Sequence, residues 1–309
     1  MKTAFVFSGQ GAQYTGMGKE LYDQEPLVRD TFTEASEVLG YDMAELCFSD
    51  DGRLNETTYT QAAILTVSTA FNRVLAANGA VPDVVAGLSL GEYSALVASG
   101  AITFKAAVAL VAKRGKFMTE AAPTGTGKMV AVMNADRDLI EDCCRQASTV
   151  GIVSPANYNT PQQIVIGGEV EAVDKAVALL TEQGVKRTIP LNVSGPFHTA
   201  LLKPASEKLA KELEKVPFST PKIQVISNTT AEVMAADQIK PLLTQQVMKA
   251  VRFADSIETM KKMGVVRIIE VGPGKTLTGF IRKIDKSIVT GRVEDQATLT
   301  ETLALLSEG

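Results

Sequence analysis

Ser89 lies in Gly87-Leu88-Ser89-Leu90-Gly91, which has the G-x-S-x-G spacing of a nucleophile elbow. The apolar residues 84–86 precede it as an expected strand, and residues 92–98 follow with a helical pattern. Glycines permit a turn too sharp for Cβ atoms, and the N-terminus of the following helix stabilises negative charge. We therefore expect Ser89 to present its hydroxyl as a nucleophile.

His198 is the only histidine in the chain, and it lies in the Gly-Pro loop Val193–Ala200. A lone histidine more often has no catalytic role. However, a serine nucleophile at neutral pH needs a base, which is usually histidine. We therefore expect His198 to pair with Ser89.

The sequence does not indicate which group orients that histidine. In a hydrolase with this kind of elbow, an acid lies between serine and histidine in the chain. The candidates Asp136, Asp138 and Asp174 all fall in a segment that we expect to form a separate small domain. A backbone carbonyl or amide is the alternative, and it would suit a thioester substrate because a thiolate leaving group needs little protonation.

Arg114 lies in Lys113-Arg114-Gly115-Lys116, within a helix expected to run from an N-cap at Thr103 to about Glu120. Such a basic run is usually a solvated face. An arginine that faces the elbow would instead bind a substrate carboxylate and select an acyl group with a free acid. The apolar residues around it are Val108, Leu110, Val111 and Phe117.

Strand-like and helix-like segments alternate along the chain, which predicts an α/β fold with a mostly parallel sheet. Between 124 and 192 the order becomes β-α-β-β-α-β, the unit of a ferredoxin-like subdomain. We expect residues 1–123 and 193–309 to form a large α/β-hydrolase-like domain, interrupted by the small subdomain at 124–192. A site at their junction is also expected.

The composition is that of an ordinary globular chain, with 309 residues, 45% hydrophobic and 21% charged. A net charge of −4 argues against a general nucleic-acid or anionic-membrane binder. No apolar run approaches the ~20 residues of a membrane span, and the N-terminal run is too short for a signal peptide. Three cysteines, two of them adjacent, favour a reducing, cytoplasmic compartment over a disulfide framework.

Two glycine-rich turns do not indicate a nucleotide site. Gly9–Tyr14 ends in tyrosine, where a dinucleotide fingerprint needs a small residue. Gly274-Lys275-Thr276 lacks the earlier glycine of a phosphate-binding loop. The sequence also contains no histidine–cysteine cluster, so we expect neither a metal nor a resident cofactor.

Several motifs nevertheless occur together in one order, and jointly they are specific. Through them, over nearly its whole length, the chain resembles the malonyl-CoA:acyl carrier protein transacylases, in the acyltransferase family of fatty acid and polyketide synthesis. The motifs are Phe5–Gln13, Gly87–Leu96, Arg114, Ser154–Asn159, Pro196–His198 and Glu270–Gly274.

The resemblance implies a role for each matching residue. Ser89 would be the nucleophile, His198 its base, and Arg114 the ligand of the malonyl carboxylate. The remaining implied site residues are Gln10 and Leu90 (backbone amides of the oxyanion hole), Gln246 (backbone carbonyl orienting the histidine), Asn157 and Asn159 (cleft wall) and Phe197 (acyl pocket).

Two positions bear on the acyl pocket. Many members of the family carry histidine before the serine, whereas this chain has Leu88. Phe197 also occurs in malonyl-loading relatives, where a bulky ring would crowd an α-methyl group. We therefore expect malonyl to be preferred over methylmalonyl.

The implied reaction is ping-pong transfer of malonyl from malonyl-CoA, through a malonyl-serine, to the phosphopantetheine thiol of acyl carrier protein in type II fatty acid synthesis. Two alternatives remain at this point: a serine hydrolase of the esterase or patatin kind, and a non-catalytic interaction module. Acyl carrier protein is acidic, which predicts a basic docking surface. The candidates for it are Lys113, Lys116, Lys186, Arg187 and Lys203.

Overall fold

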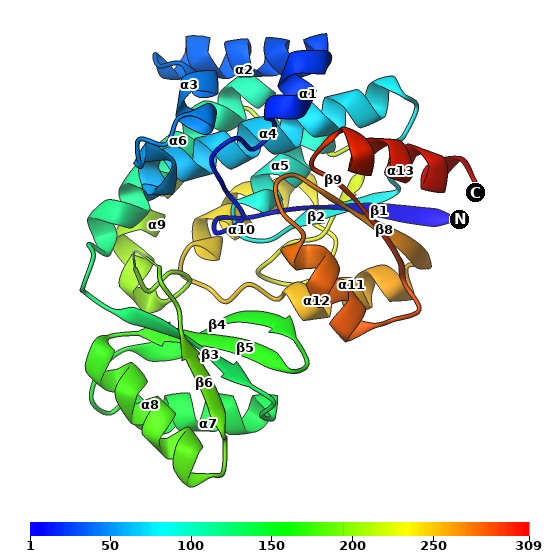
Figure 1. Cartoon of the computed structure of the whole chain (residues 1–309). Helices are drawn as coiled ribbons and strands as arrows, with labels where there is room; N and C mark the ends of the chain where they lie inside the picture. The colour runs from blue at the N-terminus through cyan, green and yellow to red at the C-terminus, as the bar shows by residue number, and fades with distance from the viewer. Residues whose placement is uncertain (194, 309) are drawn as a thin grey trace.

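The computed structural model describes residues 1–193 and 195–308. Ser194 and Gly309, which fall inside the segment expected to complete the large domain, lie outside the described residues. The described chain forms a mixed α/β structure with one parallel and one antiparallel sheet (Figure 1).

The parallel sheet has the strand order β7-β2-β1-β8-β9. Its strands are β7 (Gln224–Val225), β2 (Val84–Gly87), β1 (Lys2–Phe7), β8 (Val265–Val271) and β9 (Val289–Val293). Alternate side chains of β1 enter two different cores, as the pleat requires. Phe5 and Phe7 pack into one core with α4 (Thr57–Ala77) and α5 (Gly91–Ala98), and Ala4 and Val6 pack into the other with α11 (Phe253–Lys262) and α12 (Thr276–Ile284).

Helices therefore cover both faces of this sheet (Figure 1). They are α1 (Lys19–Gln24), α2 (Pro26–Leu39), α3 (Met43–Phe48), α4 (Thr57–Ala77), α5 (Gly91–Ala98), α6 (Phe104–Ala121), α9 (Lys203–Leu213), α10 (Ile239–Gln246), α11 (Phe253–Lys262), α12 (Thr276–Ile284) and α13 (Gln296–Ser307). Short 3-10 turns lie at Arg53–Asn55, Ala200–Leu202 and Ala236–Gln238. No described helix is long and apolar enough to cross a membrane.

The antiparallel sheet has the order β4-β5-β3-β6 and a hydrophobic core of its own. Its strands are β3 (Lys128–Met133), β4 (Val153–Thr160), β5 (Gln163–Gly168) and β6 (Arg187–Pro190). Helices α7 (Arg137–Ala147) and α8 (Val170–Glu182) lie on the face away from the parallel sheet (Figure 1).

Hydrogen bonds, an ion pair and apolar packing join the antiparallel sheet and its helices to the rest of the molecule. Val251 donates to the carbonyl of Ala156 at 2.9 Å and accepts from the N–H of Tyr158 at 2.8 Å. Arg137 on α7 forms an ion pair with Asp255 on α11 at 3.2 Å. Met129, Ala131 and Val165 of the antiparallel sheet also belong to the large hydrophobic core.

Candidate active site

The turn at Ser89 is built from close backbone contacts. A Cβ on Gly91 would lie 2.1 Å from the carbonyl oxygen of Phe7, and one on Gly87 would lie 2.0 Å from the carbonyl carbon of Gly91. Ser89 itself has φ 53°, in the left-handed region that non-glycine residues rarely adopt. The glycines thus allow the turn to press against the end of β1, with Ser89 held at its tip.

Ser89 and His198 contact each other directly, with Oγ 2.7 Å from Nε2. Nδ1 of His198 lies 2.8 Å from the carbonyl oxygen of Gln246 and 3.2 Å from that of Lys249. Carbonyl oxygens only accept, so Nδ1 carries the proton and Nε2 is free to accept from Ser89. Burial, with a smaller contribution from Arg114, lowers the pKa of His198 to about 4, which keeps the imidazole neutral.

No described carboxylate hydrogen-bonds to this imidazole. Asp136, Asp138 and Asp174, the acids that a hydrolase triad would have required, make no contact with it, and Asp174 instead pairs with Lys128. The backbone alternative is the one found in the structure.

Arg114 is 1% exposed, so the solvated-face interpretation of its basic run does not hold for this side chain. Its Nη2 atom donates to Oγ of Ser89 at 3.2 Å and to Oε1 of Gln246 at 2.9 Å. Its Nη1 atom donates to Oε1 of Gln61 at 2.7 Å. These contacts use three of the five guanidinium N–H donors, and Nε has no hydrogen-bond partner among the described residues.

A cavity of about 550 Å³ opens in front of Ser89, between the two sheets. Arg114 does not line it and lies behind Ser89. Asn159 donates to Gln163 at 2.9 Å, while its buried Oδ1 has no partner among the described residues. The sequence-predicted residues on the cavity wall are Gln10, Leu88, Ser89, Asn157, Asn159, Phe197 and His198.

Gln10 and Leu90 flank the nucleophile from two different turns. Gly9 lies so close to the elbow that a Cβ there would be 2.3 Å from the carbonyl oxygen of Leu88. Leu90 is the N-cap residue of α5. Among the described residues, the backbone N–H groups of Gln10 and Leu90 have no acceptor. Two free donors therefore lie in the turns around Ser89.

Sequence reasoning missed three buried polar residues that support this arrangement: Gln61, Glu92 and Asn228. Asn228 accepts from the N–H of Ser89 at 2.7 Å and donates to the carbonyl of Gly87 at 2.6 Å. Gln61 and Glu92 are polar residues within largely apolar helices, and this pattern could have indicated a buried polar role. Asn228 lies in a loop after a short strand, and no sequence pattern indicated it.

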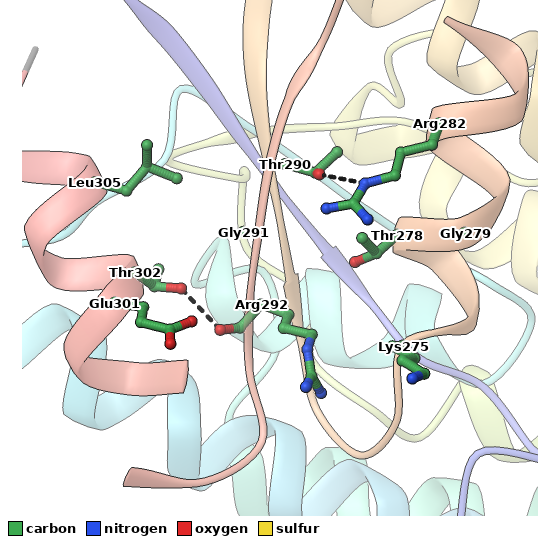
Figure 2. Close-up of a pocket in the computed structure, with 10 residues that line it drawn as sticks. All are labelled: Lys275, Thr278, Gly279, Arg282, Thr290, Gly291, Arg292, Glu301, Thr302 and Leu305. Carbon is green, nitrogen blue, oxygen red and sulfur yellow. Dashed lines mark hydrogen bonds between the residues drawn. The ribbon is translucent and has the colours of Figure 1, made fainter. Parts of the chain in front are cut away.

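A second cavity, of about 430 Å³, lies between α12, β9 and α13 (Figure 2). Lys275, Arg282 and Arg292 line it, but Arg282 donates to Thr290 and Arg292 is paired with Glu294. None of its lining residues is a predicted site residue. The described residues also hold no group of three or more side chains suited to a metal ion.

Three of the five basic residues proposed for docking are engaged by nearby carboxylates. These pairs are Lys113–Glu212 at 2.6 Å, Lys116–Glu120 at 4.0 Å and Lys203–Glu207 at 3.8 Å. Lys186 and Arg187 are exposed at the start of β6.

Similarity to known proteins identifies the family of the chain. The family model described as "Acyl transferase domain" matches residues 4–301. The chain belongs to the acyl transferase family. Among curated members of this family, the malonyl CoA-acyl carrier protein transacylase of Bacillus subtilis (strain 168) is 44% identical, over 99% of this chain and 98% of that protein. The protein of the same name from Escherichia coli (strain K12) is 43% identical, over 98% and 99%.

Solved structures of this acyl transferase family share the fold along the whole chain. The crystal structure of MCAT from Streptococcus pneumoniae is 57% identical, with a TM-score of 0.97 and complete coverage of both chains. A malonyl-transacylase in complex with a type II PKS acyl-carrier protein is 42% identical, with a TM-score of 0.96, over 99% of this chain and 100% of that one.

Proposed function

We propose that this enzyme transfers the malonyl group from malonyl-CoA to the phosphopantetheine thiol of acyl carrier protein, in type II fatty acid synthesis. The observation that carries the proposal is the buried contact of Arg114 with a serine–histidine pair that has no acid partner. Similarity to the malonyl CoA-acyl carrier protein transacylases supports malonyl-CoA as the acyl donor and acyl carrier protein as the acyl acceptor.

In the first half-reaction, Ser89 passes its hydroxyl proton to Nε2 of His198 while Oγ attacks the thioester carbonyl carbon. The resulting oxyanion is stabilised by the free N–H groups of Gln10 and Leu90, which contribute ~3 kcal/mol each by analogy with other such donors. The C–S bond then breaks, and CoA leaves with the proton from His198.

In the second half-reaction, the phosphopantetheine thiol gives its proton to Nε2 of the same histidine, and its sulfur attacks the malonyl-serine. The C–O bond breaks, and Ser89 recovers its proton. A backbone carbonyl suffices to orient His198 here because the CoA thiolate that leaves in the first half-reaction needs little protonation. The proposed steps require only the two thiols, the acyl group and residues of this chain.

Arg114 selects the acyl group in this scheme. A guanidinium prefers planar, bidentate contact with a carboxylate, and its burial beside Ser89 strengthens that attraction. Asn157 and Asn159 would bound the substrate on the antiparallel-sheet side, and Phe197 would limit the width of the pocket.

The finer architecture is proposed on the same basis. We infer an α/β-hydrolase-like domain from 1–123 and 193–309 and a ferredoxin-like subdomain from 124–192. The strand order β4-β5-β3-β6 and the separate core support the second assignment. The free, buried cysteines Cys47, Cys143 and Cys144 support a cytoplasmic location.

Mass spectrometry after mixing with malonyl-CoA tests the proposal. A malonyl adduct that is absent from Ser89→Ala and discharged by holo acyl carrier protein is expected. Release of CoA without an adduct would indicate a serine hydrolase instead. No reaction at all would indicate a non-catalytic interaction module.

A further inference from the structure

Glu92 is a buried carboxylate that the proposed reaction does not use. It lies in the first turn of α5, 1% exposed, but its oxygens accept no hydrogen bond from that helix. Oε1 accepts from the backbone N–H of Asn228 at 2.9 Å, and Oε2 accepts from Nε2 of Gln246. The carboxylate therefore contacts two segments that also contact Ser89.

The side-chain amide of Gln246 has donors and an acceptor that point to different partners. Nε2 donates to Glu92 and to the carbonyl oxygen of Ser89 at 2.8 Å, while Oε1 accepts from Nη2 of Arg114 at 2.9 Å. If the amide were flipped, its nitrogen would face the guanidinium and its oxygen would face a carboxylate. Glu92 thus fixes which end of Gln246 faces Arg114.

Asn228 and Gln246 both present N–H donors to the Glu92 carboxylate, and these contacts favour its ionised form. A glutamine at position 92 would place its own N–H₂ group against one of them. Burial raises the pKa of Glu92 to about 7, while the bonds from Asn228 and Gln246 and the charge of Arg114 act in the opposite direction.

We propose that Glu92 is a positioning residue for acyl-group selection, which fixes the amide of Gln246 so that Gln246 holds Arg114 beside Ser89. The inference rests on the proposed function, in which Arg114 binds the acyl carboxylate. Glu92 acts through Gln246 and does not touch the substrate.

The test is a selectivity ratio measured with the full-length enzyme. Acylation rates of Ser89 are followed by rapid quench and mass spectrometry with malonyl-CoA and with acetyl-CoA, which lacks the carboxylate. Glu92→Gln is expected to lower the malonyl-to-acetyl ratio about tenfold to a hundredfold, as misplaced substrate-positioning groups do. A loss of folded enzyme alone would lower both rates equally and leave the ratio unchanged.

Gln246→Met is the second variant, because it removes the amide but keeps the backbone carbonyl that accepts from His198. We expect a similar fall in the ratio, and no further fall in the double variant Glu92→Gln/Gln246→Met, since both changes break one contact chain. Additive falls, or an unchanged ratio in both single variants, would overturn the inference.

Glu270→Gln is the matched control. Glu270 is also a fully buried carboxylate, but it accepts from the N–H groups of Leu277 and Thr278 at the start of α12. The ratio should be unchanged in this variant even if its stability falls. Arg114→Ala distinguishes a failure of the proposed function from a failure of the inference on Glu92. If it leaves the ratio intact, the proposed role of Arg114 fails. If it abolishes the preference while Glu92→Gln does not, only the inference on Glu92 fails.

Discussion

The guanidinium of Arg114 lies behind the nucleophile, with Nη2 3.2 Å from Oγ of Ser89. An acyl group bonded to that oxygen is therefore attached next to a buried cation. A charge in this position is costly to bury unless it is paired, and Gln61 and Gln246 supply only neutral acceptors. A malonyl carboxylate would complete the coordination, whereas an acetyl group would not.

Arg114→Lys keeps the charge but loses the planar fork, so malonyl acylation should fall by about a hundredfold and acetyl acylation much less. Stopped-flow or quenched acylation with the two CoA esters measures this. Arg73→Lys is the control, because Arg73 pairs with Glu34 on the helical side of the molecule and should leave both rates unchanged. An equal fall with both esters would contradict a carboxylate-binding role.

His198 should remain neutral well below the ordinary range of histidine. Burial lowers its pKa from 6.5 to about 4, and, as the only histidine, its imidazole signal in an NMR pH titration needs no assignment. Between these two values the unfolded chain binds a proton that the folded chain does not. This group therefore lowers the free energy of unfolding as the pH falls from 6.5 towards 4. A titration midpoint near 6.5 would show that the imidazole is not buried as described.

Gly91→Ala should destabilise the fold, because its Cβ would lie 2.1 Å from a backbone oxygen of Phe7 that cannot move freely. We expect a loss of about 3 kcal/mol in the free energy of unfolding, measured with denaturant. Gly279→Ala in α12 has no atom within 4 Å of the new Cβ and should raise stability by about 1 kcal/mol. Similar effects of the two substitutions would refute the close packing of the elbow.

Phe197 should set the preference of malonyl over methylmalonyl. Its ring is 8% exposed and lines the cavity beside His198. Phe197→Ala is expected to raise the methylmalonyl-to-malonyl ratio of acylation rates about tenfold, the effect of about one methyl group in an apolar pocket. Leu88→Ala widens the same cavity at another point and should change the ratio less. An unchanged ratio in Phe197→Ala would place the discrimination elsewhere.

The elements that carry local signals could be predicted from the sequence. The helix capped at Thr103 was expected to end near Glu120 and ends at Ala121. The short apolar run at 128–133, which follows the turn residues 123–127, predicts a strand, and this strand is β3. The helical spacing of apolar residues predicts a helix over 60–77, and α4 begins earlier, at Thr57, since no strong capping residue marks its start.

Other elements gave weaker signals. These elements are α1, α2, α3, β9 and α13. Each is short or mixes apolar and polar residues, and packing against the rest of the fold stabilises it. The burial of Arg114 could not be derived from its basic neighbours either, because it depends on how α4 packs against α6. Spacing alone indicated the nucleophile, but the contacts between α4, α6 and α10 decide what surrounds it.

The acceptor for Nδ1 of His198 is a main-chain oxygen of Gln246, and every amino acid carries that oxygen. No single substitution at position 246 deletes it, so alanine scanning would miss this half of the catalytic apparatus. Its loss requires a shift of the end of α10, such as an insertion or a proline nearby would cause. In evolutionary terms, the base is secured by chain geometry and is insulated from most point mutations.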